Sequence, residues 1–329
     1  MSFIEKYQTL IILLAVVVGL LLGQLEVITY FSQHLIVPAL FLLFYGMFLS
    51  ISLSDVRQGF TNSKFVKVSL AINFLWTPLL AWLLGAMFLS DHPYLWLGFI
   101  MLMVTPCTDW YVIFTGIAKG NVNQSLAILP INFILQLILL PVYLYIFTGV
   151  MGGIVYTDLI KSIVIVLLIP LLSANITRKL LHAKNKSDIL EDKLIPFFSK
   201  TNIIFLSLAI AAMFASQGYQ LLENVEILLL MIIPILLFFI INFTIGQFVG
   251  RAMYLARADI VSLNFTTLAR NSPVALGIAV VAFPDQPLVA LALIIGPLLE
   301  LPILAVIAKV LLLMNNSKKQ DLAADNKKD

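Results

Sequence analysis

One stretch of this chain combines residue types that could bind a solute inside a membrane. Residues 104–121 belong to an apolar run, yet they include a proline, several hydroxyl side chains, Cys107 and Asp109. A carboxylate at the centre of a membrane-spanning helix costs roughly 2.5–3.5 kcal/mol on insertion scales. A helix that carries proline and charge at that depth normally faces a cavity rather than lipid. We therefore predict a polar cavity beside this stretch.

Cys107 is the only cysteine of the chain, so it cannot form an internal disulfide. It follows a Thr-Pro pair and precedes Thr108, which places it at a helix break rather than on a smooth helix face. As a small apolar side chain it would fill a contact between helices. As a thiol in a polar pocket it would be a soft ligand, suited to a thiophilic solute such as trivalent arsenic. Both interpretations stay open from the residues alone.

A second charged residue, Arg270, stands inside an apolar run in the other half of the chain, as Asp109 does in the first half. Isolated charges at that depth are costly, so we expect these two side chains to pair. The pair could simply lock two interrupted helices together. It could also be opened by a proton or an anionic substrate and so act as a coupling switch.

Two further polar residues lie close to prolines. Glu300 follows Pro297 by three residues, where it could satisfy backbone groups freed by proline or handle an ion or a proton. Asn132 lies just after Pro130 and shares a helix face with Gln136. Buried amides hold helices together, at roughly 0.6–2 kcal/mol each, more often than they bind ligands. We keep Asn132 as a candidate because it lies near the predicted cavity.

The composition is that of a polytopic α-helical membrane protein. Of the 329 residues, 61% are hydrophobic and 11% are charged, and the mean hydropathy of +1.04 lies far outside the range of soluble domains. The net charge of +3 is too small to indicate nucleic acid. There is no glycine-rich nucleotide loop and no nucleophile–base pair, and the three histidines are too scattered to form one metal site. We therefore expect no enzyme, no cofactor and no bound metal.

Ten apolar runs are long enough to span a membrane. The first continues past Leu22 without a small-residue cleavage site, so we interpret it as a span rather than a signal peptide. The polar, lysine-rich residues 315–329 are expected to form a disordered cytoplasmic tail. The expected spans are residues 9–25, 35–53, 66–89, 94–118, 125–147, 160–176, 202–215, 226–248, 260–283 and 287–314.

The distribution of cations favours one orientation. Segments that carry nearly all lysines and arginines are cytoplasmic when both termini are cytoplasmic, and the opposite orientation would place those cations outside. The outer loops then carry mostly acidic residues. The sequence thus predicts a multi-pass protein of the cell membrane with both termini in the cytoplasm.

Short sequence matches between the two halves of the chain indicate two repeats, residues 1–153 and 154–314. Ile72-Asn73-Phe74 in the third span matches Ile241-Asn242-Phe243 in the eighth, and a polar, proline-bearing break follows each match by about thirty residues. Five spans per half make the repeat inverted, an arrangement common in secondary transporters. We expect the interrupted fourth and ninth helices to meet near the membrane midplane and to bind the substrate there.

These motifs resemble the bile acid/sodium symporter superfamily, and most closely its arsenite-permease branch. The similarity is strongest at Pro106-Cys107-Thr108 with Lys119-Gly120-Asn121, at residues 269–279 and at residues 296–302. The resemblance implies that Cys107 is functional. It also implies a core of spans three to five and eight to ten that moves against a panel of spans one, two, six and seven.

The chain departs from both branches at defined positions. Val274 stands where the arsenite permeases carry a glutamate. The sodium-coupled branch has a Ser-Asn pair at Tyr111 and Val112, and a glutamate and a glutamine at Thr266 and Arg270. Both sodium sites implied by the resemblance are therefore largely absent, which favours a proton over sodium as the coupling ion.

Our first hypothesis is a secondary active transporter that works by alternating access and exports arsenite by proton antiport. The alternative is an ion-coupled carrier of an organic or other small anion, held by Arg270. A channel or receptor-like membrane protein is the alternative of another class, and the interrupted repeat argues against it. The expected partners are the substrate, a coupling ion and the lipid bilayer. The candidate residues are Cys107, Thr108, Asn132, Arg270, Asn271 and Ser272 for substrate, Asp109 and Glu300 for coupling, and Pro106, Pro273 and Pro297 for the helix breaks.

Overall fold

The computed structural model of the chain is helical, as expected. It describes residues 8–50, 63–107, 110–151, 161–162, 164–223, 226, 229–283 and 286–325, and every regular element named among them is a helix. Seven helices in this part of the chain are long and apolar enough to cross a membrane. The predicted fold class, an all-α polytopic membrane protein, is confirmed.

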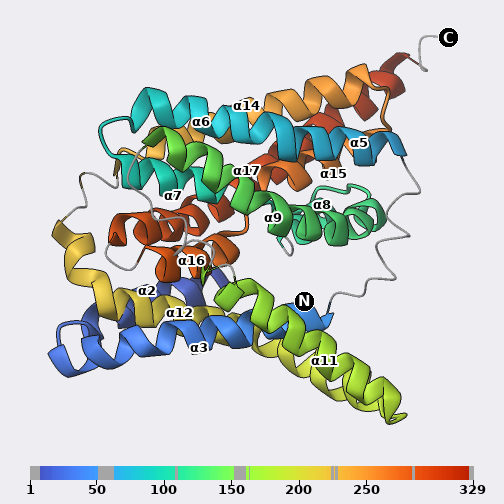
Figure 1. Cartoon of the computed structure of the whole chain (residues 1–329). Coiled ribbons are helices and arrows are strands. Elements are labelled where there is room, and N and C mark those ends of the chain that lie inside the picture. The colour runs from blue at the N-terminus through green and yellow to red at the C-terminus, as the bar shows by residue number, and fades with distance from the viewer. Residues whose placement is uncertain are drawn as a thin grey trace.

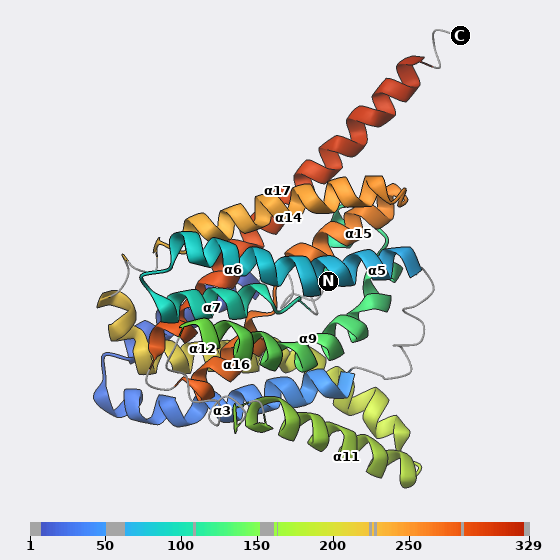
Figure 2. The same cartoon turned by 45° about the horizontal axis from the view of Figure 1, so that its top comes forward.

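The smaller of two sets of helices, which we call the panel group, combines the start and the middle of the chain. Its elements are α2 (Gln8–Leu22), α3 (Glu26–Ser50), η3 (Val164–Leu168), α11 (Ile169–Ala183), η4 (Ile189–Leu194) and α12 (Ile195–Glu223). Helix α12 packs along α2 and α3, and α11 packs on α3 (Figures 1 and 2). Gly19 of α2 and Gly23, which follows the last residue of α2, permit this, because a Cβ at either would lie 2.5–2.6 Å from a backbone oxygen of Ala211 or Ala215.

The larger set, which we call the core group, contains the remaining helices. Its elements are α5 (Ser63–Ala71), η2 (Ile72–Trp76), α6 (Thr77–Phe88), α7 (Pro93–Met103), α8 (Trp110–Ile117), α9 (Val122–Met151), α14 (Ile232–Ala252), α15 (Arg257–Leu268), α16 (Ser272–Ala282) and α17 (Pro287–Asp325). Figure 1 shows it as a separate layer against the panel group. The two groups hold the same parts of the chain that the resemblance assigned to core and panel.

Two helices of the core group are interrupted where the sequence has its polar breaks. Helix α7 ends at Met103 before α8 begins, and α15 ends at Leu268 before α16 begins. The breaks lie side by side, with Pro106 opposite Arg270 in a short antiparallel pairing. Asn271 N–H donates to the Thr105 oxygen (2.7 Å), and Cys107 N–H donates to the Ala269 oxygen (2.9 Å). Non-helical backbone in a membrane needs internal partners, and here each break supplies them to the other.

Proline also shapes the helix that contains η2. Pro78 has no N–H, so the carbonyl of Phe74 loses its helical donor. The helix widens into the π-helical turn η2 just before this proline, and the Tyr143 hydroxyl of α9 donates to the Phe74 oxygen at 2.6 Å. The substitution of a side-chain donor for a missing backbone donor ties α9 to this helix.

The limits of two expected segments differ from those in the structure. Helix α12 runs from Ile195 to Glu223, well beyond the expected span 202–215, because Lys200 lies within the helix instead of ending it. Helix α17 continues to Asp325, past residue 314, through residues that favour helix such as lysine and alanine. Residues 152–160 lie outside the described part, so the boundary at residue 153 between inverted repeats stays a prediction.

The close contact between α7 and α17 predicts a stability effect at Gly98. A Cβ there would lie 2.6 Å from both the Val289 oxygen and the Ala292 Cβ, so Gly98→Ala should lower the free energy of unfolding by roughly 1–3 kcal/mol. Thermal unfolding in detergent measures this loss of stability. Gly116→Ala is the matched control, because its Cβ would meet only Val122 Cγ2 at 3.7 Å. Equal unfolding temperatures for the two variants would contradict the tight packing.

Candidate functional site

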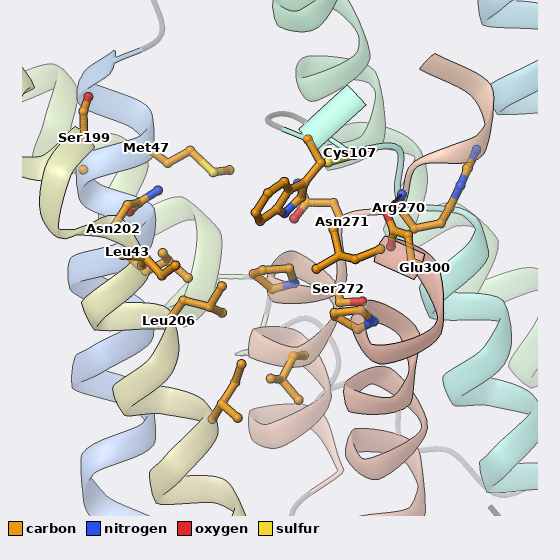
Figure 3. A pocket seen from close by; sticks show the side chains of 18 of the residues that line it. Leu43, Met47, Cys107, Ser199, Asn202, Leu206, Arg270, Asn271, Ser272 and Glu300 are labelled. Carbon is orange, nitrogen blue, oxygen red and sulfur yellow. Dashed lines mark hydrogen bonds between the residues drawn. The ribbon is translucent and has the colours of Figure 1, made fainter. Parts of the chain in front are cut away.

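A cavity of about 380 Å³ lies between the panel group and the core group. Figure 3 shows its two walls, with Met47 and Asn202 on α3 and α12 facing Cys107, Ser272 and Glu300 of the core group. The volume is at the lower end of the range of ligand cavities, roughly 300–1,000 Å³. A small solute with part of its hydration shell, or a small organic molecule, fits such a space.

Cys107 lies in the cavity wall at the crossing of the two breaks. Its side chain is 4% exposed and lines the cavity. Its backbone N–H is bound to the Ala269 oxygen, so the pairing of the breaks fixes its position. The side chain of Met47 projects from α3 into the space across from it (Figure 3). Sulfur from both helix groups therefore borders the same cavity.

The amino-terminal ends of two half-helices also reach the cavity. Trp110, the first residue of α8, lines it, and so do Asn271 and Ser272 at the start of α16. The Asn271 side chain caps α16 by accepting from the Val274 N–H at 3.4 Å. Ser272 is 3% exposed, and its hydroxyl has no hydrogen-bond partner among the described residues. Each helix N-terminus carries roughly half a positive charge, so this wall favours negative charge.

Arg270 lies at the same crossing, but its guanidinium points away from the cavity into the core group (Figure 3). Its Nη1 donates to the Met103 oxygen at 2.7 Å, and its Nε donates to the Leu268 oxygen at 3.0 Å. Nη2 donates to the Thr267 oxygen and to Asn73 Oδ1, the latter at 3.3 Å. The charged group thus binds the carboxyl-terminal ends of α7 and α15.

Glu300 connects α17 to the ninth-span break. It is buried, lines the cavity, and its Oε1 accepts a hydrogen bond from the backbone N–H of Arg270 at 2.9 Å. The carboxylate therefore satisfies a backbone group freed in a neighbouring helix. It is also the acidic side chain that the described structure places in the cavity wall.

Seven of the eleven predicted site residues line the cavity, two lie outside the described residues, and two are described but do not line it. Thr108 and Asp109 lie outside the described residues, so the Asp109–Arg270 pair stays a prediction. Asn132 is buried in α9, but it is not part of the cavity wall, and neither of its amide atoms has a hydrogen-bond partner among the described residues. Pro106 is not among the lining residues and pairs with Arg270 across the two breaks. The predicted residues that line the cavity are Cys107, Arg270, Asn271, Ser272, Pro273, Pro297 and Glu300.

The asparagines of the two matched tripeptides, Asn73 and Asn242, hold the end of α15. Asn73 Nδ2 donates to the Thr266 oxygen at 3.1 Å, and Asn242 Nδ2 donates to the Thr267 oxygen at 3.4 Å. The matched tripeptides around these asparagines were the sequence signal for them. Together they hold the carbonyls of Thr266 and Thr267, and the Thr267 oxygen also accepts from Arg270.

The motif Lys119-Gly120-Asn121 docks the loop between α8 and α9 on α15. Asn121 N–H donates to the Ala258 oxygen at 3.1 Å, and its Nδ2 donates to Asp259 Oδ1 at 2.7 Å. Lys119 has a φ of 58°, and a Cβ at Gly120 would lie 2.8 Å from Val261. This motif therefore positions α8 and does not contact the cavity.

Two crossed, interrupted helices beside a cavity, set between two groups of apolar helices, define a membrane transporter. The model of the family described as the Sodium Bile acid symporter family matches residues 37–224, more than half of the chain. The chain belongs to this family.

Similar proteins support the same class. The chain is 24% identical over 322 residues to an "Arsenical-resistance protein Acr3" of Corynebacterium glutamicum, covering 92% of this chain and 87% of that protein. It is 24% identical over 332 residues to an "Arsenical-resistance protein Acr3" of Alkaliphilus metalliredigens, covering 94% and 92%. An "Uncharacterized transporter" of Synechocystis is 21% identical over 340 residues, covering 94% and 88%.

Proposed function

We propose that this protein exports arsenite in exchange for protons, as a secondary active transporter of the cell membrane that works by alternating access. The observation that carries the proposal is the position of Cys107 at the crossing of the breaks, in the wall of the cavity. Thiolate is the preferred protein ligand of soft metal and metalloid centres. The names of the two arsenical-resistance relatives agree with this substrate.

The position of the cavity supports alternating access. Its walls belong to different helix groups, so a movement of the core group against the panel group would change which end is open. Three exposed polar residues, Ser50, Ser199 and Lys200, line one end. If both termini are cytoplasmic, as the distribution of cations favours, this end faces the cytoplasm and admits a substrate destined for export.

The side chains at the positions of the expected sodium ligands support proton coupling. The Tyr111 hydroxyl donates to the Ser125 oxygen at 2.7 Å, and the Thr266 hydroxyl donates to the Ser262 oxygen. Arg270 contributes a cation of its own. None of these three side chains supplies a carboxylate or amide oxygen for sodium, and the carboxylates Glu300 and Asp109 are the groups we assign to the proton.

A second candidate function is the transport of a small organic anion. The amino-terminal ends of α8 and α16 and the hydroxyl of Ser272 form a wall suited to a carboxylate. This wall lies beside Cys107, so one cavity serves either hypothesis. We favour arsenite over a small organic anion because the cavity wall contains the thiol of Cys107.

Everted membrane vesicles that contain the protein test the proposal. Acidification of the vesicle interior should drive accumulation of arsenite, a protonophore should abolish it, and replacement of sodium by choline should leave it unchanged. Vesicles without the protein are the control. Accumulation of a small carboxylate with no accumulation of arsenite would overturn the arsenite hypothesis in favour of the anion carrier.

A further inference from the structure

The guanidinium of Arg270 is enclosed by electron-rich groups from four elements of the core group. The residue is 2% exposed. Its donors reach carbonyl oxygens of α7 and α15 and the amide oxygen of Asn73 in η2. The Arg270 Cζ atom lies 5.1 Å from the ring centroid of Phe238 in α14, which is a cation–π distance. Oxygen atoms and an aromatic face are the surroundings that a small cation prefers.

Two helix ends place negative charge beside the guanidinium of Arg270. Met103 is the last residue of α7, and Leu268 is the last residue of α15. The carboxyl end of each helix carries roughly half a negative charge, so the two ends together are equivalent to about one. One guanidinium is enough to neutralise these two ends, and the buried carboxylate of Glu300, which accepts from the Arg270 backbone N–H, is a further acidic group beside it. Elsewhere in transporters of this architecture, the ends of interrupted helices and their freed carbonyls bind a coupling cation.

The ends of the two helices are held by hydrogen bonds that the Arg270 side chain does not make. Thr105 Oγ1 donates to the Met101 and Leu102 oxygens at 3.0 and 3.1 Å, which fixes the end of α7. Asn73 and Asn242 hold the end of α15 by its Thr266 and Thr267 oxygens. The oxygen-lined position should therefore survive removal of the arginine side chain.

We propose that Arg270 is a tethered cation that fills a cation-binding position between the ends of α7 and α15. A free monovalent cation binds there once the side chain is removed. For transport, which rests on the function proposed above, this means that no dissociable cation occupies the position during the cycle. Sodium independence at this position is then a built-in property of the chain.

Chemical rescue of the purified Arg270→Ala variant tests the proposal without any substrate. Its unfolding temperature in detergent should lie below that of the wild type. Guanidinium chloride at millimolar concentration should raise it, saturably, by about 2–5 °C. Sodium chloride should do so more weakly, against choline chloride at equal ionic strength.

Two controls separate a specific site from a general salt effect. Arg270→Lys keeps a tethered cation, so its unfolding temperature should not respond to guanidinium. Arg251→Ala removes an exposed guanidinium that binds Gln247 and should not respond either. Equal responses in all three variants, or none in Arg270→Ala, would overturn the proposal.

If Arg270→Ala fails to fold, two outcomes still test the proposed cation-binding position. Folded protein that is recovered only when guanidinium is present during purification supports the site. Failure with guanidinium, together with an Arg270→Gln variant that folds and does not respond to sodium, overturns it. Because unfolding is measured without arsenite, cation rescue in a protein that moves no arsenite would reject the proposed function alone.

Discussion

Replacing Cys107 by serine should reduce the initial rate of proton-driven arsenite uptake into everted vesicles by at least about ten-fold. The change removes one soft sulfur ligand from the cavity wall and leaves a hard hydroxyl of similar size. A ten-fold loss corresponds to about 1.4 kcal/mol of substrate interaction, which is modest for a direct ligand. The measurement is the initial rate at matched protein content.

The substitution should leave the fold intact. The backbone N–H of residue 107 donates to the Ala269 oxygen, and this contact does not depend on the side chain. Cys107→Ser and Cys107→Ala should therefore unfold at temperatures close to that of the wild type. Met47→Leu is the matched control in the opposite wall, because it replaces a thioether, a weaker ligand, and should retain more uptake.

Normal arsenite uptake by Cys107→Ser would remove the thiol from the mechanism. Uptake of a small carboxylate by the same variant would then point to the wall formed by the starts of α8 and α16. Loss of uptake together with a large fall in unfolding temperature would instead mean that residue 107 acts by packing, and that the chemical argument fails.

The interruptions of the helices could be predicted from the sequence because they consist of unusual residues. Pro106 and Pro273 stand within apolar runs, where proline and polar neighbours mark a break. The sequence predicted that the two interrupted helices meet. It did not predict that their breaks pair with each other through Thr105 and Asn271. These hydrogen bonds join backbone groups, which every residue possesses, so the residue types do not predict them.

The two walls of the cavity differed in how far the sequence predicted them. The core wall is built from anomalies in apolar runs, such as Cys107, Ser272 and Glu300, and these were predicted. The panel wall is built from ordinary helix residues, such as Met47 and Phe198, which carry no local signal. Its shape depends on Gly46, where a Cβ would lie 2.6 Å from Phe198. Such a contact between distant segments is visible only in the fold.

Arg270 shows why charge pairing was hard to predict from residue types. The sequence offered Asp109 as its partner, and that prediction stays open. The described structure adds partners of another kind, the carbonyls of Met103 and Leu268 at helix ends. A helix end is a partial charge made by backbone geometry, so it enters the argument only when the end of the helix is known.

Glu300→Ala should lower the free energy of unfolding by roughly 1–3 kcal/mol, because the buried N–H of Arg270 would lose its acceptor. Glu300→Gln keeps an acceptor oxygen at that position, so its free energy of unfolding should fall much less. Denaturant or thermal unfolding in detergent compares the two. Glu191→Ala, an exposed residue of η4, is the control and should match the wild type.

The same pair of variants separates the structural role of Glu300 from proton coupling. If the carboxylate carries the proton, Glu300→Gln should remain folded and lose uptake driven by a pH gradient, while arsenite still exchanges for arsenite across the vesicle membrane. Retained gradient-driven uptake would leave Glu300 with only its hydrogen bond to Arg270 and shift the coupling role to Asp109. Equal destabilisation by Ala and Gln would show instead that the negative charge, and not the hydrogen bond, holds the ninth-span break in place.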